Sequence, residues 1–241
     1  MERGMKAAIY RGIGELHIES VPIPKLEQPN DVLIKVLLCS ICGTDVHMMN
    51  VPPTFEAKQN TILGHEIVGI VSSVGSSVTS VKIGDRVVIN PNENCEVCKY
   101  CRLGRPNHCT NMKAMGITHD GGFAEYVKTA EKQVFPISSD LSDKHAVFAE
   151  PLACAINGYS LLGIKPLSEV VIIGCGPIGL MFAMYAKFNG AHVICVEPNA
   201  SRSAVSEKLG FSTADPYSSD IEQFTLKSFG SLADYVIDAA G

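Results

Sequence analysis

The chain has 241 residues, of which 46% are hydrophobic and 19% charged, and its formal net charge is −5. This composition is typical of a soluble globular protein with one or two domains, and the lack of a basic cluster argues against nucleic acid binding. The N-terminus lacks the apolar core of a signal peptide, and glycines interrupt the uncharged run at 170–186, so we expect no membrane span. Nine cysteines without an export signal favour metal binding over disulfides and indicate a reducing cytoplasm.

Short β-rich runs dominate the N-terminal part of the chain. Residues 5–38 predict strands, with apolar β-rich runs at 6–10 and 31–38. Further β-branched runs at 67–74 and 86–89 are bounded by glycines. This spacing of short strands favours a small barrel-like β domain.

The first candidate site follows the run that ends at residue 38. Residues 42–47, Cys-Gly-Thr-Asp-Val-His, carry a thiol, a hydroxyl and an imidazole, while Gly-His-Glu at 64–66 and Glu-Pro at 150–151 add an imidazole and carboxylates. Cysteine, histidine and carboxylate from three distant places suit one zinc ion with an open fourth position, as in a catalytic site. A nucleophile–base pair of Cys42 and His65 is the alternative, but it leaves the carboxylates of Glu66 and Glu150 without a role.

A second candidate metal site lies in the polar segment 91–111. It holds four closely spaced cysteines, namely Cys95, Cys98, Cys101 and Cys109. Four such sulfurs suit a closed tetrahedral zinc site. An iron–sulfur cluster is an alternative, although a ferredoxin run requires its fourth cysteine after three residues and this chain has a gap of seven. Free thiols are the remaining alternative.

The middle of the chain predicts a strand at 123–127 and one helix at 141–162, capped by Asp140 or Ser142. The apolar neighbours of Glu150 in this helix predict that its carboxylate is buried and needs a partner such as zinc. The remaining single cysteines are expected in the core: Cys39, Cys154, Cys175 and Cys195.

The C-terminal part changes to a β-α-β pattern. A strand at 170–173 leads into Gly174-Cys-Gly-Pro-Ile-Gly179 and a helix to about residue 188, and the next strand, 192–196, ends at Glu197. This is the dinucleotide-binding fingerprint: the glycines let the backbone approach a pyrophosphate at the helix N-terminus. Glu197 would accept hydrogen bonds from a ribose 2′-hydroxyl and so favours NAD, although Arg202 could accommodate the 2′-phosphate of NADP.

Further helices are expected at 201–209 and up to residue 229, followed by a strand at 233–241. Because a full doubly wound dinucleotide fold has six strands, we expect about two further βα units beyond this sequence.

Together these motifs resemble the zinc-dependent medium-chain alcohol dehydrogenases, and in particular the sorbitol (polyol) dehydrogenase-like branch. The similarity runs from about Met5 to the end and includes the motifs at 42–47, 64–66, 84–87, 150–152 and 174–179 and the four-cysteine lobe. The resemblance implies an α/β protein. A GroES-like, β-rich catalytic domain is expected at 1–155, and a truncated doubly wound Rossmann domain at 156–241. The family chain continues past this point and returns to complete the catalytic domain.

The resemblance also implies roles for the site residues. Cys42, His65 and Glu150 would surround the catalytic zinc, and Glu66 would either enter the shell or hydrogen-bond to a zinc-bound water. Thr44 and His47 would carry the substrate proton to solvent by way of the cofactor ribose. The dinucleotide would contact a set of residues in the second domain: Gly174, Gly176, Pro177, Ile178, Gly179, Glu197 and Arg202.

The expected function is zinc-dependent oxidation of a secondary alcohol or polyol to a ketone with NAD. Alternatives are an L-threonine 3-dehydrogenase, a butanediol dehydrogenase, or a truncated and inactive dinucleotide-binding module. The expected partner is a small-molecule alcohol or polyol, and the full-length protein is expected to form a homo-oligomer.

Overall fold

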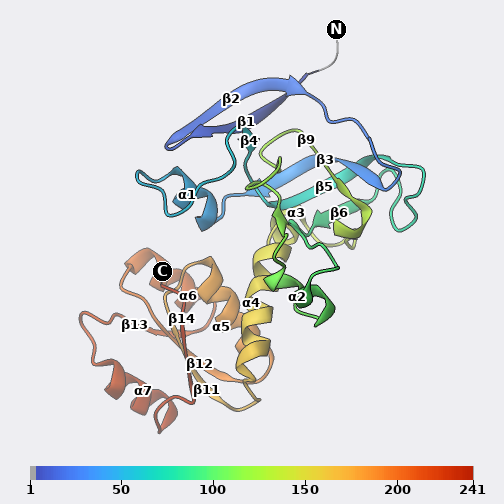
Figure 1. Ribbon diagram of the computed structural model, residues 1–241. Helices are drawn as coiled ribbons and strands as arrows, with labels where there is room; N and C mark the ends of the chain where they lie inside the picture. The colour runs from blue at the N-terminus through green and yellow to red at the C-terminus, as the bar shows by residue number, and fades with distance from the viewer. Residues whose placement is uncertain (1–3, 241) are drawn as a thin grey trace. The chain divides into compact units, whose positions relative to one another are not determined.

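A computed structural model describes residues 4–240 of the chain (Figure 1). The chain falls into two compact units, Met1–Glu150 (unit 1) and Pro151–Gly241 (unit 2). The division lies within helix α4, Ala149–Leu162, which also contains the boundary expected after residue 155. The two units are described separately below.

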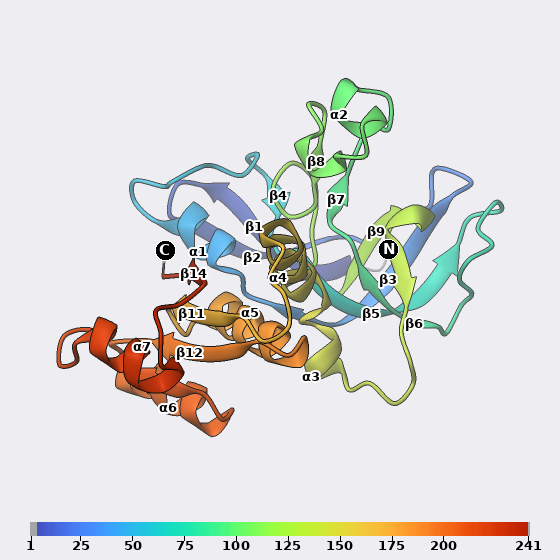
Figure 2. The same ribbon diagram turned by 90° about the horizontal axis from the view of Figure 1, so that it is seen from below.

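Unit 1 is built from three antiparallel sheets, ordered β2-β1-β4, β10-β6-β5-β3-β9 and β7-β8. Figure 2 shows β7 and β8 beside helix α2, away from the five-stranded sheet. This β-rich unit is the predicted GroES-like domain. Its strands are β1 Gly4–Gly12, β2 Glu15–Pro22, β3 Asp31–Ser40, β4 Thr61–Ile62, β5 Glu66–Val74, β6 Arg86–Ile89, β7 Asn92–Glu93, β8 Lys113–Ala114, β9 Tyr126–Ala130 and β10 Val134–Pro136.

The largest core cluster of unit 1 includes side chains from one face of the five-stranded sheet, since side chains alternate between faces along each strand. Val32 and Ile34 from β3 pack there with Ile67 and Val71 from β5, and all four are at most 2% exposed. The register of β3 and β5 runs from Val32 opposite Val74 to Ser40 opposite Glu66. The ends of these two strands therefore lie beside the first candidate site.

The helices of unit 1 are short: α1 Gly43–Met49, α2 Lys99–Arg102 and α3 Asp143–Ala146, with 3-10 turns at Pro106–His108 and Glu131–Gln133. The single helix predicted at 141–162 is wrong, since α3 ends at Ala146 and α4 begins at Ala149. Pro151 explains the break, because its ring would clash with the carbonyl of Val147 in a continuous helix, whereas proline is tolerated in a first turn. The strand predicted at 123–127 begins at Tyr126.

Unit 2 is a four-stranded parallel sheet in the order β13-β12-β11-β14, with helices between the strands (Figure 1). Val170 and Ile172 of β11 pack with Ala183 and Ala186 of α5 on one face, and Val171 packs on the other face, toward α7. This is the predicted Rossmann-like arrangement. Its elements after α4 are β11 Glu169–Ile173, α5 Pro177–Phe188, β12 His192–Val196, α6 Ala200–Lys208, β13 Ser212–Ala214, α7 Ile221–Phe229 and β14 Tyr235–Asp238.

The structure corrects one prediction about single cysteines. Cys175 and Cys195 are buried as expected, and Cys39 is half-buried, but Cys154 is exposed. Cys154 lies on α4 next to Ala155, which is fully buried, and one residue along a helix turns a side chain by about 100°. Its apolar neighbours in the sequence therefore did not determine its burial.

Candidate functional site

Cys42 is fixed by the start of helix α1. It is the N-cap residue, and its Sγ accepts a hydrogen bond from the backbone N–H of Thr44 at 3.4 Å. In return, the Oδ2 atom of Asp45 accepts from the backbone N–H of Cys42 at 2.9 Å. This reciprocal capping box gives acceptors to backbone N–H groups that have no partner within the helix, and it sets the direction of the thiol.

His65 and Glu66 are fixed by a close contact between two loops. Gly64, with φ +90°, turns the chain into β5, and its carbonyl accepts from the N–H of Gly122 at 2.8 Å. A Cβ atom at Gly121 would lie 2.1 Å from the Gly64 oxygen, so only glycine allows this approach. The two loops together hold the imidazole and carboxylate in place.

These elements bring together Cys42, His65 and Glu66. Their ligand atoms lie within 4.8 Å of one another, and the histidine and glutamate are 7% and 5% exposed. Sulfur, imidazole nitrogen and carboxylate oxygen are the donors that zinc prefers. Among the described residues, none gives a hydrogen bond to the buried Nδ1 of His65, which lies 3.8 Å from Asp45 Oδ1. The donor set therefore fits a zinc ion.

The charges around His65 also favour a cation. Burial lowers the pKa of His65, but a hydrogen bond with Cys42 and the negative charges of Asp45, Cys42 and Glu150 outweigh it, so the pKa lies above 6.5. Burial is the main cause that raises the pKa of Asp45. A buried imidazole surrounded by acids is the electrostatic setting of a metal site.

The other predicted residues of this site have different positions. Glu150 is half-buried near the start of α4, and its charge raises the pKa of His65. The group whose ligand atoms lie within 4.8 Å of one another contains Glu66 instead of Glu150. Its flank Phe148 is 43% exposed, so the apolar neighbours do not enclose the Glu150 carboxylate as predicted. Thr44 is half-buried and His47 exposed, both on α1.

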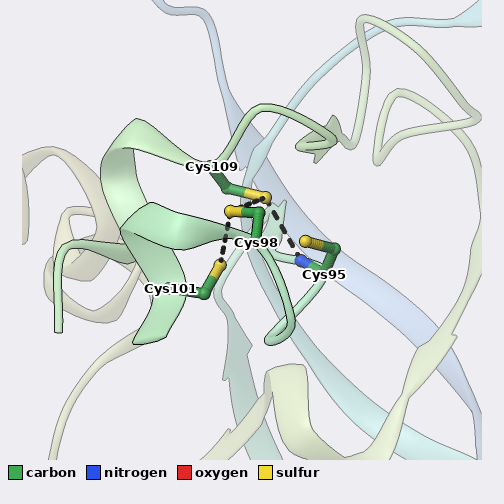
Figure 3. Close-up of side chains that lie close together, drawn as sticks. All are labelled: Cys95, Cys98, Cys101 and Cys109. Carbon is green, nitrogen blue, oxygen red and sulfur yellow. Dashed lines mark hydrogen bonds between the residues drawn. The ribbon is translucent and has the colours of Figure 1, made fainter. Parts of the chain in front are cut away.

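The four lobe cysteines converge on one point (Figure 3). Their Sγ atoms all lie within 4.8 Å of one another, with Cys98 to Cys101 at 3.5 Å. Backbone N–H groups of Cys95 and Asn111 donate to the Cys109 sulfur at 3.3 and 3.4 Å. Backbone hydrogen bonds lower the pKa of Cys98 to about 5, while burial and the neighbouring thiols raise the pKa of Cys101 to about 12. The arrangement fits a closed four-sulfur zinc site.

The glycine-rich loop of unit 2 leaves the start of α5 open. Gly174 has φ +92°, and a Cβ atom at Gly179 would lie 1.9 Å from the Gly174 oxygen. Gly176 is the N-cap of α5 and makes no side-chain cap hydrogen bond, and the first turn, which contains Pro177 and Ile178, carries no acid. A helix N-terminus with free N–H groups and no acid fits a pyrophosphate.

Glu197 ties this loop to strand β12. It is 3% exposed, and its carboxylate accepts hydrogen bonds from the backbone N–H groups of Cys175 at 2.7 Å and Asn199 at 2.8 Å. Arg202 is exposed in the first turn of α6, which Asn199 caps. The sequence predicted contact of Glu197 with ribose but did not indicate that its carboxylate also holds the glycine-rich loop.

Sequence reasoning also missed two neighbours of the metal group. Asp45 caps the start of α1 and also faces His65. The hydroxyl of Ser40 donates a hydrogen bond to Glu66. Both contacts join segments that are distant in the sequence, so local patterns contain no signal for them.

Comparisons with known proteins place the chain in a family. Residues 28–139 match the alcohol dehydrogenase GroES-like domain. D-arabinitol dehydrogenase 1 of Uromyces fabae is 40% identical over 81% of this chain and 55% of its own length. D-xylulose reductase A of Aspergillus niger is 35% identical over 97% of this chain and 68% of its own length. A Sinorhizobium meliloti 1021 protein solved in complex with NADP superposes with a TM-score of 0.93 at 39% identity, covering 100% of this chain and 71% of that one.

The chain therefore belongs to the zinc-dependent medium-chain alcohol dehydrogenase family, in its sorbitol dehydrogenase-like branch. It spans 55% and 68% of the lengths of the two curated relatives. Within residues 4–240, none of the helices has the length and apolar composition needed to cross a bilayer.

Proposed function

We propose that the protein oxidises a secondary alcohol or polyol to a ketone, with zinc in unit 1 and NAD bound by unit 2. The observation that carries this proposal is the group of half-buried Cys42 with buried His65 and Glu66, whose three donor types suit a zinc ion with an open position. When bound, zinc supplies Lewis-acid polarisation of a hydroxyl, and the nicotinamide supplies a hydride acceptor.

The residues of unit 1 have separate tasks in this proposal. Cys42 and His65 hold the ion, and the carboxylates of Glu66 and Glu150 balance its charge or complete its shell. The hydroxyl of Thr44, half-buried two residues after Cys42, takes the proton of the substrate hydroxyl while it releases its own proton toward His47, so it relays the proton and stays neutral. His47 is exposed on the same helix and exchanges that proton with water.

We propose NAD rather than NADP as the cofactor. Glu197 directly follows β12, its carboxylate accepts a hydrogen bond from the glycine-rich loop at the N–H of Cys175, and a negative charge there repels a 2′-phosphate. Arg202, exposed nearby, is the feature that favours NADP, and the related protein solved with NADP makes a direct comparison of both cofactors necessary.

Three wider assignments belong to the same proposal. Residues 1–155 would form the catalytic domain and 156–241 the dinucleotide-binding domain, and the full-length protein would be a homo-oligomer. A cytoplasmic location is supported by the nine cysteines, all of which are free of disulfides. A non-catalytic dinucleotide-binding module has no need for the three-residue ligand group, which argues against that alternative.

The test combines metal analysis with rate measurements on a panel of polyols, L-threonine, 2,3-butanediol and simple alcohols, each with NAD and with NADP. The proposal predicts two zinc ions per chain and NAD-linked oxidation of a polyol. Cys42→Ser should remove one zinc ion and the activity, whereas Cys154→Ser, an exposed cysteine in unit 2, should change neither. One zinc ion in the wild type, together with no turnover of any substrate, would contradict the proposal.

A further inference from the structure

Ser40 and Glu66 are paired across the last rung of the β3–β5 ladder. The register places Ser40 opposite Glu66 and Cys39 opposite Ile67, and β3 ends at Ser40 where β5 begins at Glu66. Side chains directly opposite each other in an antiparallel pair point to the same face. The serine hydroxyl is therefore brought to the glutamate by the sheet itself.

The Ser40 hydroxyl donates a hydrogen bond to the Oε2 atom of Glu66. Glu66 is 5% exposed and Ser40 half-buried, so this bond satisfies a carboxylate oxygen that has little access to water. A hydroxyl that donates to a carboxylate forms one of the stronger hydrogen bonds in proteins. This bond fixes the orientation of the carboxylate and leaves it further acceptor sites for another contact.

The same carboxylate belongs to the metal-binding group. Glu66 has an oxygen within 4.8 Å of the ligand atoms of Cys42 and His65, and Cys42 follows Ser40 by two residues. Ser40 thus lies on the segment that carries one ligand while it holds the side chain of another. His65 precedes Glu66 directly, so all three ligands are attached to the two strand ends that this hydrogen bond joins.

We propose that Ser40 is a positioning residue of the metal site. Its hydroxyl fixes the carboxylate of Glu66 so that one oxygen is directed toward the ligand atoms of Cys42 and His65. Ser40 itself is not a ligand, and it acts on metal affinity through Glu66. This inference rests on the proposed metal site.

The experiment measures Co²⁺ binding to the metal-free protein by its thiolate-to-metal charge-transfer absorption. The part of the signal that Cys42→Ser removes belongs to the site, and the remainder reports the four-cysteine lobe, while circular dichroism reports folding. Ser40→Ala should raise the Co²⁺ dissociation constant of the site about tenfold, the effect typical of lost outer-shell contacts. Ser40→Thr keeps the hydroxyl and should restore wild-type affinity.

The matched control is Ser73→Ala, at a half-buried serine of β5 that pairs with Leu33, far along the ladder from Glu66. It should leave Co²⁺ affinity unchanged. If Ser40→Ala does not fold, as judged by circular dichroism, Ser40→Val takes its place, because valine lacks the hydroxyl, has the shape of threonine and is favoured in strands.

A double-mutant cycle tests whether Ser40 acts through the carboxylate. In the Glu66→Ala background, which leaves no acceptor for the Ser40 hydroxyl, Ser40→Ala should cause no further loss of affinity. An equal loss in both backgrounds, or wild-type affinity in Ser40→Ala, would overturn the positioning role. If instead Cys42→Ser removes no Co²⁺ signal from the otherwise wild-type protein, the proposed metal site itself fails, which is a separate result.

Discussion

Asp45 serves two partners at once: one oxygen caps helix α1 at the N–H of Cys42, and the other lies 3.8 Å from Nδ1 of His65. The carboxylate therefore connects the backbone of Cys42, which carries the thiol, with the imidazole of His65. Orientation of a ligating histidine through its second ring nitrogen is a general feature of zinc sites.

Asp45→Asn should weaken zinc binding about tenfold, because the amide keeps the cap but removes the charge beside His65. Competition with a chelator measures the affinity. The control is Asp85→Asn, since Asp85 makes the same kind of cap at 2.9 Å to the N–H of Lys82. Equal zinc affinity in the two variants would show that the charge of Asp45 does not support the site.

Gly116→Ala should destabilise the protein by about 2–4 kcal/mol, the range of severe steric substitutions. Gly116 has φ +75°, and its Cβ atom would lie 2.7 Å from the oxygen of Gly64, directly before His65. Gly84→Ala is the matched control, because φ is +94° there and no atom lies within 4 Å of the added Cβ. This variant should lose only about 1 kcal/mol of stability, from backbone strain without a steric clash. Denaturant unfolding measures both, and equal losses would exclude a role for the Gly64 contact.

Glu197→Gln should destabilise unit 2 by about 1–3 kcal/mol and weaken NAD binding. The amide can accept from only one of the backbone N–H groups of Cys175 and Asn199, and the other is left facing an NH₂ group. Glu207→Gln, on the exposed surface of α6, provides the comparison. Unfolding and calorimetric titration with NAD check the two effects, and a Glu197→Gln protein that matches Glu207→Gln in both would refute this role.

Glu131→Gln should reduce stability in a pH-dependent way. Backbone N–H groups of Ser80 and Thr79, each 2.6 Å from Glu131 Oε1, lower the pKa of this carboxyl below 4.5. A lowered folded pKa means that the stabilisation is present above the unfolded pKa and is lost as the pH falls through the folded value. Unfolding midpoints of wild type and variant should therefore differ at neutral pH and converge in acid. A constant difference would contradict this assignment.

Much of the fold could be predicted from local patterns. The strands 86–89 and 192–196 have the predicted bounds, because glycines or a helix boundary flank their β-branched runs. The four-cysteine lobe and the glycine-rich loop could be predicted for a similar reason, since the cysteines of one and the glycines of the other are close together in the sequence. In contrast, β13, Ser212–Ala214, is too short to show a period, and its pairing with β12 depends on the whole sheet.

The candidate site was only partly predictable because its contacts depend on long-range register. Cys42, His65 and Glu66 could be named from their residue types, and the structure places their ligand atoms together. The hydrogen bond of Ser40 to Glu66 requires the register of β3 against β5, which no local motif gives. The break between α3 and α4, in turn, reflects Pro151, whose effect depends on where the helix begins.

The most direct test of the central claim is an anomalous difference map at the zinc absorption edge, from crystals grown with zinc supplied. The account predicts two peaks per chain, one bound by Cys42 and His65 beside Glu66, and one at the centre of the four cysteines. A peak at the four cysteines alone, with density showing the Cys42 and His65 side chains ordered but without an ion, would contradict it.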